Sequence, residues 1–213
     1  MKKVYLFSGL GADYRAFEKL DFSTFDITHI NWITPNKEES IESYAYRIST
    51  QIQSDNSILI GLSFGGIIAV EVSKYIKTDK VILLASAKMK QEIPLYYKFL
   101  GKLQLHKLIP VSILKNANVL SYWFFGVSNK SEKLLLKNIL KDTDSIFLKW
   151  ALDKIINWKN VSFKNNVIHI HGSADRILPI RYIKTDFIVK NGGHFMTLNK
   201  NIELSNLIKK IIL

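Results

Sequence analysis

One serine stands between glycines at a point where a reactive hydroxyl could be displayed. The residues are Gly61-Leu62-Ser63-Phe64-Gly65, directly after the apolar run Ser57–Leu62 and directly before an apolar stretch of helical pattern. A serine on a sharp strand-to-helix turn exposes its hydroxyl, and the flanking glycines allow the close backbone approach that such a turn requires. The alternative is an ordinary turn in which Ser63 caps the helix. We favour a nucleophile, because chance alone would not also place this pattern at a strand-to-helix boundary.

A serine hydroxyl is a weak nucleophile and needs a base, and the base needs a partner that orients it. Two later segments supply candidates. Asp175 lies in the loop after the apolar strand Val167–Gly172, and His194 follows the strand Phe187–Lys190 through Asn191-Gly192-Gly193. Because the carboxyl ends of parallel strands meet at one edge of a sheet, we expect Ser63, Asp175 and His194 to lie together at the edge where ligands bind.

The elements that must position these residues alternate between short strands and helices, the order expected of a parallel sheet with crossover helices. The predicted strands are Val4–Phe7, Phe25–Ile30, Ser57–Leu62, Val81–Ala85, Val167–His171 and Phe187–Val189. The predicted helices are Ser40–Ser54 with Ser40 as N-cap, Phe64–Lys77 and Leu198–Leu213. The sequence thus predicts an α/β fold, with about six mostly parallel strands flanked by helices.

The segment between the fourth and fifth predicted strands is much longer than a normal crossover and has helical patterning. We therefore divide the chain into a core of residues 1–86 and 166–213 and an inserted helical lid of residues 87–165. From Lys88 to Asn160 there are 13 Lys against five Asp and Glu, so most of the formal net charge of +12 lies on the insertion. The insertion is also rich in aromatic residues, which we expect to pack its helices on the sheet and in part to wall an acyl pocket.

Composition excludes several classes of protein. The 213 residues suffice for one domain with a sizeable core, and the absence of Cys excludes disulfides, Cys-ligated metal and a thiol nucleophile. The longest nearly apolar run, Ile58–Val70, is too short to cross a bilayer. Lys2 and Lys3 before Val4–Ala12 imitate a secretion signal, but Ser8 and two glycines interrupt the apolar stretch, and we interpret it as a strand. The expectation is a cytoplasmic protein without a membrane span.

Together these motifs resemble the α/β-hydrolase family over most of the chain apart from the insertion. The matching segments are Ser8-Gly9-Leu10-Gly11, Gly61-Leu62-Ser63-Phe64-Gly65, His171-Gly172-Ser173-Ala174-Asp175 and Gly192-Gly193-His194. The resemblance implies that Ser63 is the nucleophile, His194 the general base and acid, and Asp175 the orienting carboxylate. It also implies an oxyanion hole formed by the backbone amides of Leu10 and Phe64.

This chain departs from the family in two places. Ser8-Gly9 stands where the family usually has His-Gly, so the side-chain support of that loop differs. The two strands that normally open the family's sheet are also missing, which predicts a six-stranded short form.

The resemblance implies a serine hydrolase, a carboxylesterase or thioesterase, that cleaves a carboxylic ester or thioester of a small acyl substrate. The alternatives are a lyase or C–C hydrolase reaction on the same fold, or a non-catalytic binding protein. A general lysine bias is the favoured explanation of the basic insertion, and attraction of an acidic acyl carrier or coenzyme A is the second. No motif supports nucleic-acid binding, and no cofactor or metal is expected.

Other polar residues have structural interpretations. His169 and His171 share one face of a strand without further ligands nearby, which favours packing over metal binding. Asp13 is expected to cap the helix that starts near Tyr14. Arg176 is interpreted as a solvated loop charge, with steering of an anionic group as the alternative.

Overall fold

A six-stranded parallel sheet forms the centre of the molecule. The computed structural model describes all 213 residues, and the strand order is β2-β1-β3-β4-β5-β6 with every neighbouring pair parallel. The strands are β1 (Lys3–Phe7), β2 (Asp26–His29), β3 (Ser57–Leu62), β4 (Thr78–Leu84), β5 (Val167–Gly172) and β6 (Phe187–Val189). The predicted fold class is confirmed. Only β4 starts clearly earlier than expected, because its polar first residues still pair with the start of β3 across a bulge at Ser57/Ile58.

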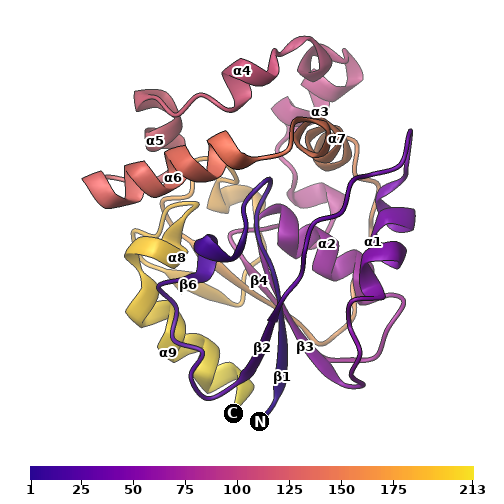
Figure 1. Cartoon of the computed structure of the whole chain (residues 1–213), viewed down its shortest axis with the longest axis vertical. Coiled ribbons are helices and arrows are strands. Elements are labelled where there is room, and N and C mark those ends of the chain that lie inside the picture. Colours follow the sequence, from indigo (N-terminus) through magenta and orange to yellow (C-terminus); the bar gives the residue numbers. More distant parts are fainter.

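The core has two layers, one on each face of the sheet. Alternate residues of β1 divide between them: Val4 and Leu6 face one layer, and Tyr5 and Phe7 face the other. The helices α8 (Met196–Asn199) and α9 (Asn201–Ile212) cover the first face, and α1 (Ile41–Ser49) and α2 (Phe64–Val72) cover the second (Figure 1). Because both faces are covered, β3 is buried along its whole length.

The three predicted helices exist, but the first two end earlier than expected and the third is divided in two. Ser40 caps α1 as expected, its side chain accepting from the Ser43 amide, yet α1 ends at Ser49 rather than Ser54. The chain must reverse there to enter β3, and Asn56 has a left-handed φ of 55° in that turn. The helix α2 ends at Val72, because the Ser73 hydroxyl donates to the Val70 carbonyl and the chain turns toward β4. The predicted C-terminal helix is divided at Lys200 into α8 and α9.

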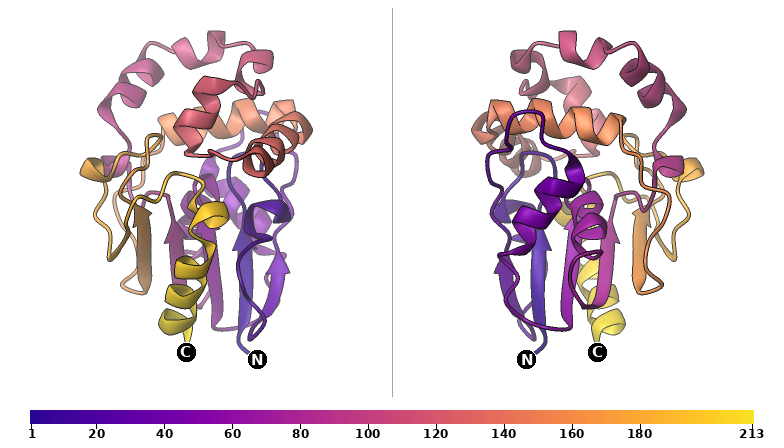
Figure 2. Two further views of the ribbon diagram at one scale, coloured as in Figure 1. Left: turned by 90° about the vertical axis from the view of Figure 1, so that its left-hand side faces the viewer. Right: turned by 90° about the vertical axis from the view of Figure 1, so that its right-hand side faces the viewer.

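Between β4 and β5 the chain forms helices only. They are α3 (Leu95–Lys102), α4 (Val111–Leu114), α5 (Val119–Phe125), α6 (Lys130–Asp142) and α7 (Ser145–Ile156), with short 3-10 turns at Lys90–Glu92 and Leu105–Leu108. These helices arch over the carboxyl ends of the strands, at the pole opposite the two termini (Figures 1 and 2). No helix of the chain combines the length and apolar character that crossing a membrane requires.

Candidate active site

Ser63 occupies a strained turn at the carboxyl end of β3. Its backbone has φ 52° and ψ −121°, a conformation that costs a non-glycine residue free energy and is found mainly where function requires it. The Ser63 amide donates to the Leu84 carbonyl at 2.9 Å, and the Ser63 carbonyl accepts from the Ser86 hydroxyl at 2.6 Å. The turn is thus held from β4 and from the residues that follow it.

Two glycines near Ser63 are required because neighbouring backbone atoms leave no room for a side chain, and not because their φ angles are unusual. A Cβ on Gly65 would lie 2.2 Å from the carbonyl oxygens of Phe7 and Ser8, and one on Gly61 would lie 2.4 Å from Gly66 Cα. Since real Cβ atoms do not approach so closely, the start of α2 can pack against the end of β1 only with Gly65, and against the end of β3 only with Gly61. Gly65 therefore sets the distance between Ser63 and the loop after β1.

The three residues that the sequence singles out converge at this edge of the sheet. His194 Nε2 lies 2.8 Å from Ser63 Oγ, and His194 Nδ1 lies 2.8 Å from Asp175 Oδ2. Asp175 follows β5, and His194 follows β6 through a loop that is packed on the Asp175 loop, where Ala174 donates its amide to the Gly192 carbonyl. Asp175 and His194 are each only 4% exposed, whereas Ser63 is half-buried. A continuous hydrogen-bonded path therefore links a buried carboxylate to a more accessible hydroxyl.

Asp175 is held ionised by the groups around it. Burial by itself raises the pKa of its carboxyl, but the charge and hydrogen bond of His194 outweigh this and hold that pKa below its ordinary value. The other oxygen, Oδ1, accepts from the amides of Ile177 and Leu178 at 2.9 Å each. Both oxygens are thus occupied, which fixes the carboxylate and makes His194 Nδ1 the donor to it.

Two backbone amides beside Ser63 have no partner within the chain, a property that they share with the neighbouring amides of Gly9, Gly11 and Gly65. Phe64 is the first residue of α2, and Leu10 lies in the loop after β1; neither amide donates a hydrogen bond within the protein. The approach of the two segments is close, because an added Cβ on Gly9 would lie 3.6 Å from Ser63 Cβ. These are the two amides that the sequence resemblance selects.

Side chains that sequence analysis did not identify hold the loop after β1. The Ser8 hydroxyl donates to the Ala12 carbonyl at 2.5 Å, and Trp32 Nε1 donates to the same oxygen at 3.1 Å. Thr143, between α6 and α7, lies with Oγ1 2.8 Å from the Gly11 carbonyl. Gly11 has φ +65°, and a Cβ there would overlap Thr143. Ser8 was visible in the sequence only as a departure from His-Gly, and nothing in the sequence pointed to Thr143.

The helical segment also contacts the other two loops of the site. The Phe125 ring stands edge-on to the His194 ring at 5.8 Å between centroids, and the Phe125 carbonyl accepts from the Phe195 amide. Arg176, beside Asp175, donates to the Trp123 carbonyl at 2.7 Å and stacks over the Trp123 ring. Arg176 is thus engaged with α5 rather than only solvated. All three loops of the site have a partner among the helices between β4 and β5.

The remaining polar candidates have structural surroundings. Asp13 caps the 3-10 turn Tyr14–Phe17, as predicted, by accepting from the Arg15 amide. His171 Nε2 faces the Leu178 carbonyl at 2.8 Å and therefore carries a proton, so His171 Nδ1 accepts from His169 Nε2 at 3.2 Å. Burial lowers the pKa of both imidazoles. These two histidines form a neutral pair behind Asp175.

A cavity of about 260 Å³ adjoins the loop after β1. Gly11, Ala12 and Asp13 line one side of it, and Trp32, Thr143 and Phe147 line another. Phe147 is one of the insertion aromatics, but Ser63 is not among the lining residues, so the acyl pocket expected from the sequence remains a prediction.

Comparison with solved structures identifies the fold. An esterase from Exiguobacterium antarcticum superposes with a TM-score of 0.76 at 16% identity, covering 100% of this chain and 92% of the esterase. A bromoperoxidase from Bacillus anthracis gives a TM-score of 0.66 at 16% identity, covering 99% of this chain and 91% of that one. A 2-hydroxy-6-oxo-6-phenylhexa-2,4-dienoate hydrolase from Rhodococcus sp. strain RHA1 gives 0.67 at 16% identity, covering 99% and 90%. The chain has the α/β-hydrolase fold.

Sequence comparisons add nothing to this result. No protein-family model matches the chain, and a sequence search of curated proteins finds no match.

Proposed function

We propose that the protein is a serine hydrolase that cleaves a carboxylic ester or thioester of an acyl substrate through an acyl-enzyme on Ser63. The observation that carries the proposal is the unbroken path from Asp175 Oδ2 through His194 to Ser63 Oγ, with 2.8 Å at each step. That path is what a serine needs to become nucleophilic near neutral pH. The esterase neighbour from Exiguobacterium antarcticum supports the same class of reaction.

The proposed reaction has two balanced halves. Ser63 Oγ attacks the acyl carbon while His194 Nε2 takes its proton, and His194 then returns that proton to the departing alcohol or thiol. Water next attacks the acyl-enzyme and loses a proton to His194, and His194 returns that proton to Ser63 Oγ as the Oγ–acyl bond breaks and the acid leaves. Asp175 stays ionised throughout and supports the transient positive imidazolium, in keeping with its lowered pKa.

The Leu10 and Phe64 amides are proposed to bind the oxyanion of each tetrahedral intermediate. Their freedom from partners in the chain supports this proposal. Each such donor is worth about 3 kcal/mol of transition-state stabilisation. The helices between β4 and β5 are proposed to act as a lid, since they contact every loop of the site.

A fluorophosphonate probe tests the nucleophile directly. We expect covalent labelling of the wild type and none of Ser63→Ala, because the probe reacts only with an activated serine hydroxyl. Hydrolysis of p-nitrophenyl esters of graded chain length, run beside acyl thioesters, identifies the substrate class. Equal labelling of the two proteins would end the proposal.

The leaving group has a second candidate, an acidic acyl carrier or coenzyme A drawn to the basic helical segment. The 13 lysines against five carboxylates between Lys88 and Asn160 favour it. Measuring kcat/KM against ionic strength tests it, since a carrier substrate should lose kcat/KM steeply with salt and a neutral ester should not.

The same labelling and hydrolysis experiments distinguish ester cleavage from the alternative functions, which are a lyase or C–C hydrolase reaction and non-catalytic binding. The structural neighbours include a bromoperoxidase and a dienoate hydrolase, so the fold alone does not determine the reaction. Labelling at Ser63 without turnover of any ester or thioester would favour a lyase or C–C hydrolase reaction. A protein that is neither labelled nor active would be a binding protein.

A further inference from the structure

The outermost part of the helical segment exposes an unusual number of apolar side chains. We call residues 95–125, which include α3, α4 and α5, the outer arch; it forms the pole farthest from the termini (Figures 1 and 2). Its large exposed apolar side chains are Leu95, Tyr96, Phe99, Leu103, Leu105, Leu108, Ile113, Val119, Leu120 and Trp123. Leu108 is 76% exposed and Val119 85%. Exposed large apolar side chains concentrated in one segment are typical of an interaction surface.

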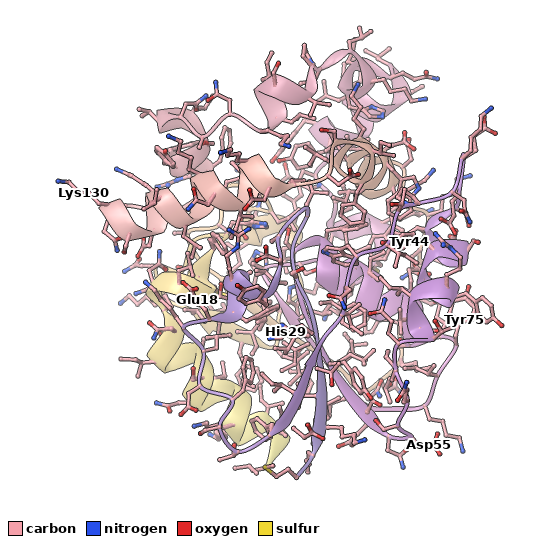
Figure 3. All side chains as sticks on the ribbon, in the orientation of Figure 1. Glu18, His29, Tyr44, Asp55, Tyr75 and Lys130 are labelled. Carbon is pink, nitrogen blue, oxygen red and sulfur yellow. The ribbon has the colours of Figure 1, made fainter.

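The charge of the same region has one sign. The outer arch contains four lysines and no Asp or Glu, and the flanking residues 93–94 and 126–131 add only Lys130. The lysines are Lys98, Lys102, Lys107, Lys115 and Lys130, of which Lys130 points away from the molecule at the start of α6 (Figure 3). A second copy of this chain would therefore meet the arch with like charge. The partner of this surface must be negative as well as tolerant of apolar side chains.

Beside the arch lies a basic cavity that suits a phosphate group. It has a volume of about 410 Å³ between α4 and α6, and Lys115, Lys137 and Lys141 line it with Ser112 and Asn116, without any carboxylate. Lys115 also donates to the Thr143 carbonyl at 2.7 Å, which fixes its ammonium group. Lys137 and Lys141 are exposed and remain available to an anion.

We propose that the outer arch is a docking surface for anionic phospholipid bilayers. Its leucine, isoleucine, valine and aromatic side chains would enter the interface, while the lysines of the arch and of the neighbouring cavity would bind headgroup phosphates. Basic charge alone would suit an acidic protein equally well, but the exposed apolar side chains on short, outward-facing helices favour a lipid surface. Docking of this kind turns the edge of the sheet that bears Ser63 toward the membrane, and it does not depend on the reaction proposed above.

Sedimentation with lipid vesicles tests the proposal on the full chain. We expect the protein to pellet with phosphatidylcholine vesicles that contain phosphatidylglycerol, and to bind vesicles of phosphatidylcholine alone at least ~10-fold more weakly. Leu108→Ser/Ile113→Ser/Val119→Ser should reduce binding by ~10-fold or more, since it removes three side chains that would enter the interface. Lys137→Glu/Lys141→Glu should also weaken binding and should reduce its salt dependence, while the lysines of the arch keep part of it.

The matched control is Lys3→Glu/Lys210→Glu, which makes the same charge change with exposed lysines near the termini. It should bind as the wild type does. Circular dichroism melts and hydrolysis of a soluble ester check that each variant is folded. Absence of sedimentation with anionic vesicles would overturn the proposal, as would equal losses in the control and the arch variants. Binding of an acidic carrier protein that depends on the arch, without vesicle binding, would assign the surface to a protein instead.

Discussion

At the scale of single residues, the geometry of the candidate site depends on side chains that hold the backbone in place as well as on Ser63, Asp175 and His194. Ser8 is the most direct case. Its hydroxyl fixes the Ala12 carbonyl within the loop that carries the Leu10 amide, and it is only 3% exposed. It thereby supports the loop at the position where sequence analysis expects a histidine.

Ser8→Ala should lower kcat about 10-fold with little change in KM, less than the 100-fold or more that loss of an oxyanion donor itself causes. The Ala12 carbonyl keeps its bond from Trp32, so the loop loosens without collapsing. Steady-state kinetics on a p-nitrophenyl ester measures the effect. Ser49→Ala is the matched control, because it removes a similar bond, from Ser49 Oγ to the Tyr46 carbonyl at 2.7 Å, on α1. If both variants lose the same kcat, Ser8 has no special positioning effect.

Ser63, Asp175 and His194 could be predicted from local sequence patterns, because each follows a strand that is recognisable in the sequence. The contacts that support the loop after β1 could not be predicted in this way. Thr143 meets Gly11 across 132 positions of sequence, and that contact exists only because the helical segment folds back over the sheet.

At the scale of elements, the strands were predictable and the helix ends were not. Four of the strands are nearly continuous apolar runs, whereas the end of a helix depends on where the chain must turn, as at Ser73 and Lys200. The positions of the helices between β4 and β5 could not be predicted from the sequence either. Their contacts with Gly11, Arg176 and His194 depend on tertiary packing of short helices.

Thr143→Val tests this coupling between elements. Valine keeps the shape of threonine but removes the hydroxyl that lies 2.8 Å from both the Gly11 and Ile139 carbonyls. We expect the free energy of unfolding to fall by about 1–2 kcal/mol and kcat to fall several-fold. Urea unfolding and ester kinetics measure the two effects.

Thr50→Val, which removes an exposed bond from Thr50 Oγ1 to the Arg47 carbonyl, should change stability by less than about 0.5 kcal/mol and leave kcat unchanged. A Thr143→Val protein that loses stability but keeps full kcat would limit Thr143 to a structural contact.

At the scale of the whole molecule, the buried histidine pair makes stability depend on pH. Burial lowers the pKa of His169 and of His171 in the folded chain, so the unfolded chain binds more protons once the pH falls below the ordinary histidine value of about 6.5. Stability is therefore complete above that value and is lost as the pH falls from it toward the lowered pKa values.

Urea unfolding at a series of pH values checks this dependence. Between the ordinary and the lowered pKa values, each histidine changes the free energy of unfolding by at most about 1.4 kcal/mol per pH unit. His169→Gln, which cannot be protonated, should make the loss of stability with falling pH less steep than in the wild type. His29→Gln is the comparison variant: burial also lowers the pKa of His29, which lies outside the pair, so this variant measures the part of the pH dependence that the pair does not cause. An unchanged slope in His169→Gln would contradict the proton linkage.

The two ends of the chain meet far from Ser63. Lys2 Nζ donates to the Ile212 carbonyl at 2.5 Å, at the edge where the parallel strands begin. An affinity tag or a surface tether joined to either end would consequently leave the opposite pole open, and immobilised molecules would present the edge that carries Ser63 outward (Figure 1).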